Sequence, residues 1–163
     1  MTDLINALKT FRRKEEIDVK MKKLNVYLNF NGNTEDVFNF YKSAFKGKFI
    51  IIQRFKDMPD GNNFPKKDQN KIMHVSLQIN KDIILMASDA LESQGQKVVQ
   101  GNNFYIQIEP ESKKETDKLY ESLSTGGKIE MKLQDAFWGA YSCMFKDKFG
   151  TGWMINYTYP KKK

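Results

Sequence analysis

Hydrophobic and polar residues alternate with a period of two over residues 24–30, a pattern typical of a half-buried β-strand. A short turn of Asn and Gly follows, and Asn33 with Asp36 three positions later resembles a helix capping box. Apolar residues then recur at helical spacing as far as Gly47, where we expect the helix to end. The first half of the chain therefore begins with a strand and an amphipathic helix.

Three further apolar stretches predict strands over residues 49–55, 72–79 and 83–87. An Asn-Lys-Asp turn separates the last two, which predicts a hairpin. The residues between the first two, 56–69, are polar and contain two prolines, so they predict a long loop. A loop of this length in a compact domain is often a lid or a binding loop, and we expect it over a cavity or at a dimer contact.

The second half of the chain repeats this order of elements. A strand is predicted over residues 104–108, and Ser112 with Glu115 forms an S-x-x-E capping box that begins the next helix. The pair Gly126-Gly127 ends that helix. The remaining apolar stretches predict strands over residues 129–133, 140–145 and 153–157.

The two halves, about 24–89 and 102–157, share the order strand, helix and three strands, although their sequence identity is low. A sheet with one apolar face cannot bury that face alone, so we expect the two modules to pack together. The predicted fold class is α+β, with two βαβββ modules in a domain that spans residues 21–160. Residues 1–20 carry apolar positions at helical spacing and then a charged run, and predict a short N-terminal helix and linker.

Composition and charge narrow the possible functions. Of the 163 residues 40% are hydrophobic and 29% are charged, which is typical of a globular protein. The net charge of +7 lies mostly at the two ends, because residues 24–160 carry 17 Lys and Arg against 16 Asp and Glu. We therefore expect no nucleic-acid partner, and the absence of a long apolar run predicts no membrane span. A single cysteine and the lack of a signal-peptide pattern favour the cytoplasm.

The chain contains one cysteine, Cys143, and one histidine, His74. These counts exclude an internal disulfide, a multi-cysteine zinc site and a two-histidine metal site within one chain. We expect Cys143 to be a buried, unreactive thiol because it lies in the middle of an apolar predicted strand. Four methionines on predicted strands are candidates for a soft cavity lining or for ordinary core filling: Met73, Met86, Met144 and Met154.

Six short segments occur in an order that resembles the PhnB-like branch of the vicinal oxygen chelate superfamily, which has the glyoxalase/bleomycin-resistance/dioxygenase fold. The resemblance covers about residues 24–158. The segments are YLNFNG at 27–32, FY at 40–41, IMH at 72–74, LMASD at 85–89, WG at 138–139 and DKFGTGW at 147–153.

The resemblance implies that the two modules form a glyoxalase-like incomplete barrel around a cavity, and that the protein is a homodimer. Metal-using members of the superfamily hold a divalent ion with His and Glu on the first and last strands of each module. These positions fall here at about Asn25, Met86, Asn103 and Met154. Met and Asn are poor ligands for hard divalent ions compared with imidazole and carboxylate. We therefore predict no metal site of this type and no cofactor.

The candidate ligand-binding residues include these four mapped positions and five others. Tyr27 lies on the first strand, and His74 is either a general base or a structural histidine. Asp89 either faces the cavity mouth or is a turn or cap residue. Trp138 and Tyr141 are candidates for stacking on a flat ligand.

Two classes of function remain open. In the first, the protein binds a small organic ligand in an apolar, aromatic-lined cavity without the usual metal. In the second, it is a metal-dependent lyase or dioxygenase of the superfamily type. The absence of the expected ligands favours the first, and it leaves open whether the protein is an enzyme. A methyltransferase activity, a label used for some PhnB-like proteins, gains no support because the chain lacks a nucleotide-binding glycine loop. An interaction module that uses the basic N-terminal helix is the least favoured alternative.

Overall fold

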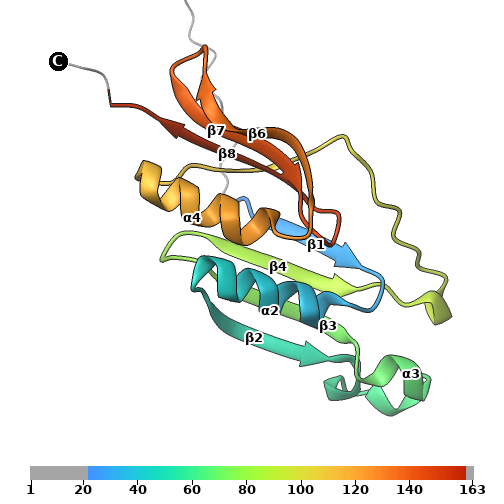
Figure 1. Ribbon diagram of the computed structural model, residues 1–163. Helices are drawn as coiled ribbons and strands as arrows, with labels where there is room; N and C mark the ends of the chain where they lie inside the picture. The colour runs from blue at the N-terminus through green and yellow to red at the C-terminus, as the bar shows by residue number, and fades with distance from the viewer. Residues whose placement is uncertain (1–21, 161–163) are drawn as a thin grey trace, which may run out of the picture.

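The computed structural model describes residues 22–160, so the predicted N-terminal helix lies outside the described residues. Two modules follow one another along the chain (Figure 1). The first contains β1 (Val26–Phe30), α2 (Thr34–Phe45), β2 (Lys48–Arg54), β3 (Ile72–Gln78) and β4 (Ile84–Asp89). The second contains β5 (Ile106–Ile108), α4 (Lys113–Ser124), β6 (Lys128–Ala136), β7 (Ala140–Lys146) and β8 (Gly152–Thr158).

Each module forms one four-stranded mixed sheet. The strand orders are β1-β4-β3-β2 and β5-β8-β7-β6, so the two sheets have the same topology. In both, the first strand pairs in parallel with the last strand, and the other pairs are antiparallel. The α+β fold with two βαβββ modules, predicted from the repeated order of elements, is therefore confirmed.

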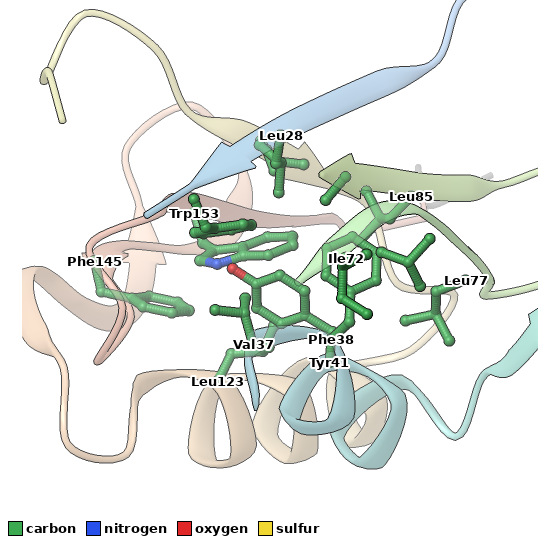
Figure 2. Close-up of a cluster of buried hydrophobic side chains, with 14 of the residues drawn as sticks. Leu28, Val37, Phe38, Tyr41, Ile72, Leu77, Leu85, Leu123, Phe145 and Trp153 are labelled. Carbon is green, nitrogen blue, oxygen red and sulfur yellow. The ribbon is translucent and has the colours of Figure 1, made fainter. Parts of the chain in front are cut away.

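One hydrophobic core serves both modules. The two helices lie on the same side of the sheets (Figure 1), and α2 contacts α4 as well as its own sheet. Side chains alternate between the two faces of each strand. Most of those that point toward the helices are apolar and form the core. Figure 2 shows the cluster, whose labelled members are Leu28, Val37, Phe38, Tyr41, Ile72, Leu77, Leu85, Leu123, Phe145 and Trp153.

A buried hydrogen-bond network joins the modules at one carboxylate. The Tyr41 hydroxyl of α2 donates to Asp147 Oδ2 at 2.7 Å, and Trp153 Nε1 donates to the same oxygen at 2.9 Å. The backbone amides of Phe149 and Thr151 donate to Asp147 Oδ1 at 2.8 and 3.0 Å. Burial and the neighbouring carboxylate raise the pKa of Tyr41 well above its usual value, so its hydroxyl remains a donor.

The beginning and the end of α2 differ in detail from the prediction. Asn33 is at the N-cap position, but its side chain makes no capping bond. Asp89 at the end of β4 takes that role, since its Oδ1 accepts from the amide of Thr34 at 3.0 Å. At the other end the left-handed residue is Lys46 (φ 55°) rather than Gly47. Gly47 is required for space instead, because a Cβ there would lie 2.7 Å from the carbonyl oxygen of Gln78.

The N-cap half of the capping box predicted for α4 is present, because Ser112 Oγ accepts from the amide of Glu115 at 3.2 Å. The Glu115 carboxylate accepts from the Ser112 hydroxyl at 3.1 Å. The predicted loop at 56–69 contains short helical turns, namely η1 (Phe55–Asp57), η2 (Gly61–Asn63) and α3 (Lys66–Gln69). A further turn, η3 (Glu92–Gln94), begins the connection between the modules. None of the helices within residues 22–160 is both long enough and apolar enough to cross a lipid bilayer.

Candidate functional site

The faces of the two sheets that point away from α2 and α4, here called the open faces, carry the strand side chains that the core does not bury. In the first sheet Leu28, Val75 and Ala87 belong to the core, so their neighbours along each strand point to the open face. The register places two rows of side chains across this face. One row is Tyr27, Met86, Ser76 and Ile51, and the next is Asn29, Ser88, His74 and Gln53.

A chain of three polar side chains lies on the first open face. The Tyr27 hydroxyl is 3.2 Å from His74 Nδ1, and His74 Nε2 is 2.9 Å from the hydroxyl oxygen of Ser76. The rings of Tyr27 and His74 are stacked, with centroids 5.7 Å apart and planes at 28°. Ser76 is buried, whereas Tyr27 is 45% exposed. The chain therefore leads from a buried hydroxyl to one that solvent or a ligand can reach.

A cavity of about 460 Å³ adjoins this face at the C-terminal ends of β1 and β4. A second cavity of about 240 Å³ lies between β1 and the turn that joins β7 to β8. Asn29 and Val98 line both cavities. The larger one has a mixed lining of Asn29, Phe55, Met73, Ser88, Asp89, Ala90, Gln96, Lys97 and Val98.

The connection between the modules forms one wall of both cavities. Asn31, just after β1, holds it in place, since its amide nitrogen donates to the carbonyl oxygen of Val98 and its amide oxygen accepts from the Val98 amide, both at 3.2 Å. Gln100 donates to the carbonyl oxygen of Phe149 at 2.6 Å. The connection therefore contacts both modules beside the open face. Phe55, just before the predicted long loop, also lines the larger cavity.

Three of the residues selected from the sequence meet on the first open face. Tyr27 and His74 are hydrogen-bonded, and Met86 is the register partner of both Tyr27 and Ser76. Asn25 precedes β1 and is exposed.

Two more of the selected residues lie in the second module, away from the Tyr27 and His74 pair. Asn103 lies in the connection before β5 and is exposed. Met154 lies on β8, on the open face of the second sheet, opposite Gln107 and Met144.

The two candidates for stacking lie apart from this group. Tyr141 shares the helix-facing side of β7 with Cys143, and its hydroxyl donates to Asp117 of α4 at 3.0 Å. The Lys113 ammonium lies 4.1 Å from its ring centroid. Trp138 lies in the turn between β6 and β7, is 53% exposed and donates to Asn156 at 3.3 Å.

Asp89 lines the larger cavity, but its carboxylate is buried and fully engaged in the fold. Its Oδ1 accepts from the amide and the hydroxyl of Thr34 at 3.0 and 2.6 Å. Its Oδ2 accepts from the amide of Ile72 at 2.8 Å. The side chain therefore joins the start of α2 to the start of β3, as expected for the cap alternative.

The positions that would hold a metal in this fold do not suit a hard divalent ion. Of the positions mapped from the sequence, Asn25 precedes β1 and Asn103 precedes β5, so neither lies on a strand, whereas Met86 lies beside Tyr27 and Met154 lies beside Gln107. The side chains at these positions are amides, thioethers and a phenol, whereas hard ions prefer carboxylate and imidazole ligands. No group of three or more His, Cys, Asp or Glu residues within 22–160 is arranged to hold a metal ion.

Reasoning from the sequence did not select Asn29, Ser76 or Ser88, although all three lie on the first open face. The alternation of the strands contained a partial signal, because Ser76 is two residues from His74 and Asn29 is two residues from Tyr27. The hydroxyl of Ser88 donates to Asn29 Oδ1 at 3.1 Å. Which strands lie side by side, and in which register, follows only from the tertiary structure.

The model of the protein family described as 3-demethylubiquinone-9 3-methyltransferase matches residues 22–156. The protein YjdN from Escherichia coli K12 is 31% identical over 141 residues, which are 82% of this chain and 93% of YjdN. The crystal structure of PA1353 from Pseudomonas aeruginosa is 33% identical, has a TM-score of 0.72, and covers 83% of this chain and 98% of its own.

More distant solved structures share the fold. A putative 3-demethylubiquinone-9 3-methyltransferase, PhnB protein, from Bacillus cereus is 22% identical with a TM-score of 0.68, over 84% of this chain and all of its own. A glyoxalase-related enzyme from Fulvimarina pelagi is 13% identical with a TM-score of 0.54, over 85% of this chain and 89% of its own. The architecture of the two modules is thus that of the glyoxalase and bleomycin-resistance superfamily.

Proposed function

The chain belongs to the PhnB-like family described as 3-demethylubiquinone-9 3-methyltransferase, within the glyoxalase and bleomycin-resistance superfamily, and we propose that it binds a small organic ligand. The proposed site is the open face of the first sheet together with the adjoining cavities of about 460 and 240 Å³. Tyr27 lines the smaller cavity, and Asn29 lines both. The larger volume suits a small ligand. The proposal concerns binding, and it requires no resident metal.

The observation that carries this proposal is the hydrogen-bonded chain from Ser76 through His74 to Tyr27. Ser76 is buried, so its bond to Nε2 fixes the orientation of the imidazole ring. In the tautomer whose Nε2 donates a hydrogen bond to Ser76, Nδ1 of His74 accepts a hydrogen bond from the Tyr27 hydroxyl. The oxygen of Tyr27, a residue that is 45% exposed, can then accept a hydrogen bond from a hydroxyl or amine of a ligand.

The surroundings of this chain combine polar and apolar contacts. Met86 lies beside Tyr27 in the register, and a methionine side chain adapts to ligands of different shape. Asn29 and Ser88 lie in the neighbouring row and also line the cavity. We therefore propose a ligand with a planar or apolar body and at least one hydroxyl, amine or carbonyl group. The apolar contacts would give affinity, and the polar groups would give orientation.

The alternative function is a metal-dependent lyase or dioxygenase of the superfamily type. The side chains at the expected ligand positions do not favour it, because none of Asn25, Met86, Asn103 and Met154 is an imidazole or a carboxylate. Methyl transfer, which the description of the family names, gains no support from a glycine-rich nucleotide loop in this sequence. Binding without turnover is therefore the proposal that the site supports best.

Nuclear magnetic resonance of the labelled full chain with a library of small planar phenols, amines and ketones tests the proposal. Compounds that bind should shift the ring signals of His74. Tyr27→Phe should lower their affinity by about tenfold, because one hydrogen bond of about 1.4 kcal/mol is lost. Tyr157→Phe is the matched control, because Tyr157 lies on the opposite, helix-facing side of β8. If the hits map elsewhere, or if Tyr27→Phe and His74→Gln leave their affinity unchanged, the site is assigned wrongly.

Metal analysis of chelator-free protein tests the alternative. We expect no stoichiometric Mg²⁺, Mn²⁺, Fe²⁺, Ni²⁺ or Zn²⁺ after purification without an affinity tag. About one ion per chain, with a rise in melting temperature that a chelator reverses, would favour the lyase or dioxygenase instead. Substituting Asn25, Asn103 and Asp89 by alanine would then identify the polar groups that matter.

We further propose that the protein is a homodimer. The edge strand β2 exposes three consecutive isoleucines, Ile50, Ile51 and Ile52, which are 50%, 44% and 42% exposed. An exposed apolar edge strand is a surface that a second sheet can cover. Sedimentation velocity should give the mass of a dimer, and Ile51→Lys should shift it toward the monomer. A monomer at all concentrations for the unaltered chain would contradict this proposal.

A further inference from the structure

Three methionines form a single row across the open face of the second sheet. Met131 on β6 is the register partner of Met144 on β7, and Met144 is the partner of Met154 on β8. Residues that face each other directly across antiparallel strands have side chains on the same face. All three are half-buried. The thioethers of three neighbouring strands are therefore adjacent on one surface.

The spacing of the row allows the three sulfur atoms to converge. Neighbouring strands lie about 4.8 Å apart, so the outer two methionines begin about 10 Å from each other at the backbone. Each side chain has three rotatable bonds, and the two outer ones can lean toward Met144. A one-residue irregularity between Ile129 and Met131 brings Met131, and not its neighbour Glu130, opposite Met144.

We propose that this row, Met131, Met144 and Met154, is a binding site for a soft monovalent metal ion, Cu(I) or Ag(I). Thioethers are neutral, polarisable ligands that select Cu(I), whereas hard ions such as Mg²⁺ or Mn²⁺ prefer oxygen ligands. Met154 occupies the last-strand position at which the superfamily resemblance places a hard ligand. Met131 and Met144 on the neighbouring strands add two more thioethers beside it. Three thioethers suit a soft monovalent ion rather than a hard divalent ion.

Two of the charged groups near the row have hydrogen-bond partners of their own. The Lys146 ammonium, one pleat away on β7, donates to the carbonyl oxygen of Gly101 at 3.1 Å and is held at the connection. Glu130 is engaged by the Tyr105 hydroxyl, and this interaction raises the pKa of Tyr105.

Lys128, the register partner of Lys146, lies in the same neighbouring row, so two ammonium groups flank the methionines on one side. The next row across the same three strands is polar and uncharged, and consists of Gln134, Ser142 and Asn156. Cys143 cannot join the set, because its thiol points into the core on the other face of β7.

Titration of the full chain with Ag(I), which needs no reductant, tests the site. The methyl groups of methionine, labelled with ¹³C, report each thioether separately. We expect about one Ag(I) per chain, with the signals of Met131, Met144 and Met154 shifting together, and the same shifts with Cu(I) under anaerobic conditions. Mg²⁺ should leave all three signals unchanged. If the three signals do not shift together with Ag(I), the proposal is wrong.

Substitutions by leucine remove the sulfur and keep the side-chain volume. The triple variant Met131→Leu, Met144→Leu and Met154→Leu should bind Ag(I) at least about tenfold more weakly, whereas Met58→Leu, an exposed methionine outside the row, should bind as the unaltered chain does. Unchanged binding by the triple variant, or loss of binding in Cys143→Ala alone, would overturn the proposal. If the triple variant does not fold, the test rests on the Ag(I) affinity of the single variant Met144→Leu, which should be lower, and on the methyl shifts of the unaltered chain. Tyr27→Phe should have no effect, which separates this site from the proposed organic-ligand site.

Discussion

Replacing Tyr41 by phenylalanine should lower the free energy of unfolding by about 2 kcal/mol. The hydroxyl of Tyr41 donates to Asp147 at 2.7 Å and lies 2.9 Å from the hydroxyl oxygen of Thr151. Hydrogen bonds to a charged group contribute about 1.5–3 kcal/mol each. Phenylalanine keeps the buried ring, so no cavity forms, and the loss is that of the bonds alone. A change of 2 kcal/mol alters the ratio of folded to unfolded molecules by roughly 30-fold.

Asp147 itself should be far less tolerant than its partner. After Tyr41→Phe the carboxylate still accepts from the Trp153 indole and from two backbone amides. After Asp147→Ala the indole and both amides lose their acceptor inside the protein, and leaving buried donors unpaired costs about 1–3 kcal/mol each. We therefore expect Asp147→Ala to cost more than about 3 kcal/mol.

Urea unfolding followed by circular dichroism measures both effects, with the dependence on urea concentration checked for a two-state transition. Tyr157→Phe is the matched control, since Tyr157 lies outside this network, and its change should stay within about 0.5 kcal/mol. If Tyr41→Phe costs no more than Tyr157→Phe, the network does not hold the modules together as argued. The same conclusion follows if Asp147→Ala is the milder of the two changes.

Three further predictions concern groups whose environment the fold sets. Burial raises the pKa of Tyr41 well above 10.0, so above about pH 10 the folded chain keeps a proton that the unfolded chain loses. The free energy of unfolding should therefore fall above about pH 10, by up to about 1.4 kcal/mol per pH unit. The difference in unfolding free energy between the unaltered chain and Tyr41→Phe should therefore narrow above that pH; a constant difference would contradict this. Burial raises the pKa of the Cys143 thiol to about 11, so a disulfide reagent at pH 8 should modify this thiol only after denaturant is added. Rapid modification of the native protein would contradict this, because it would show that the thiol is accessible. Asp89→Ala should cost about 2–3 kcal/mol in thermal or urea unfolding, because the amides of Thr34 and Ile72 lose their acceptor; a loss of ligand affinity without a loss of stability would make Asp89 a binding residue instead.

The elements of the fold could be predicted because their signals are local. Alternation over 24–30 identifies a strand, which the structure places at Val26–Phe30. Of its apolar face, Leu28 and Phe30 are buried, whereas Leu24 and Val26 are exposed. The capping box at Ser112 identifies the start of α4 because both partners lie within one turn of helix. The repeated order of such elements then predicts two modules that share a core.

Local signals fail where a side chain finds its partner in a distant segment. Asn33 looks like the cap of α2, but Asp89, 55 residues from its partner Thr34, takes that role. Tyr141 looks like a cavity residue, yet its position relative to Cys143 on β7 directs it toward α4. The period of two distinguishes the two faces of a strand, but it does not say which face the helix will cover.

The sequence by itself therefore determined the fold class of the protein, its two modules, its family resemblance and the lack of His and carboxylate at the mapped metal positions. Only the tertiary structure decided which side chains meet. Tyr27 and His74 are 47 residues apart, Tyr41 and Asp147 are 106 apart, and the methionine row spans three strands. The physical reason is that periodicity and capping act within a few residues, whereas strand order, register and bulges follow from burying the apolar faces of the whole chain at once.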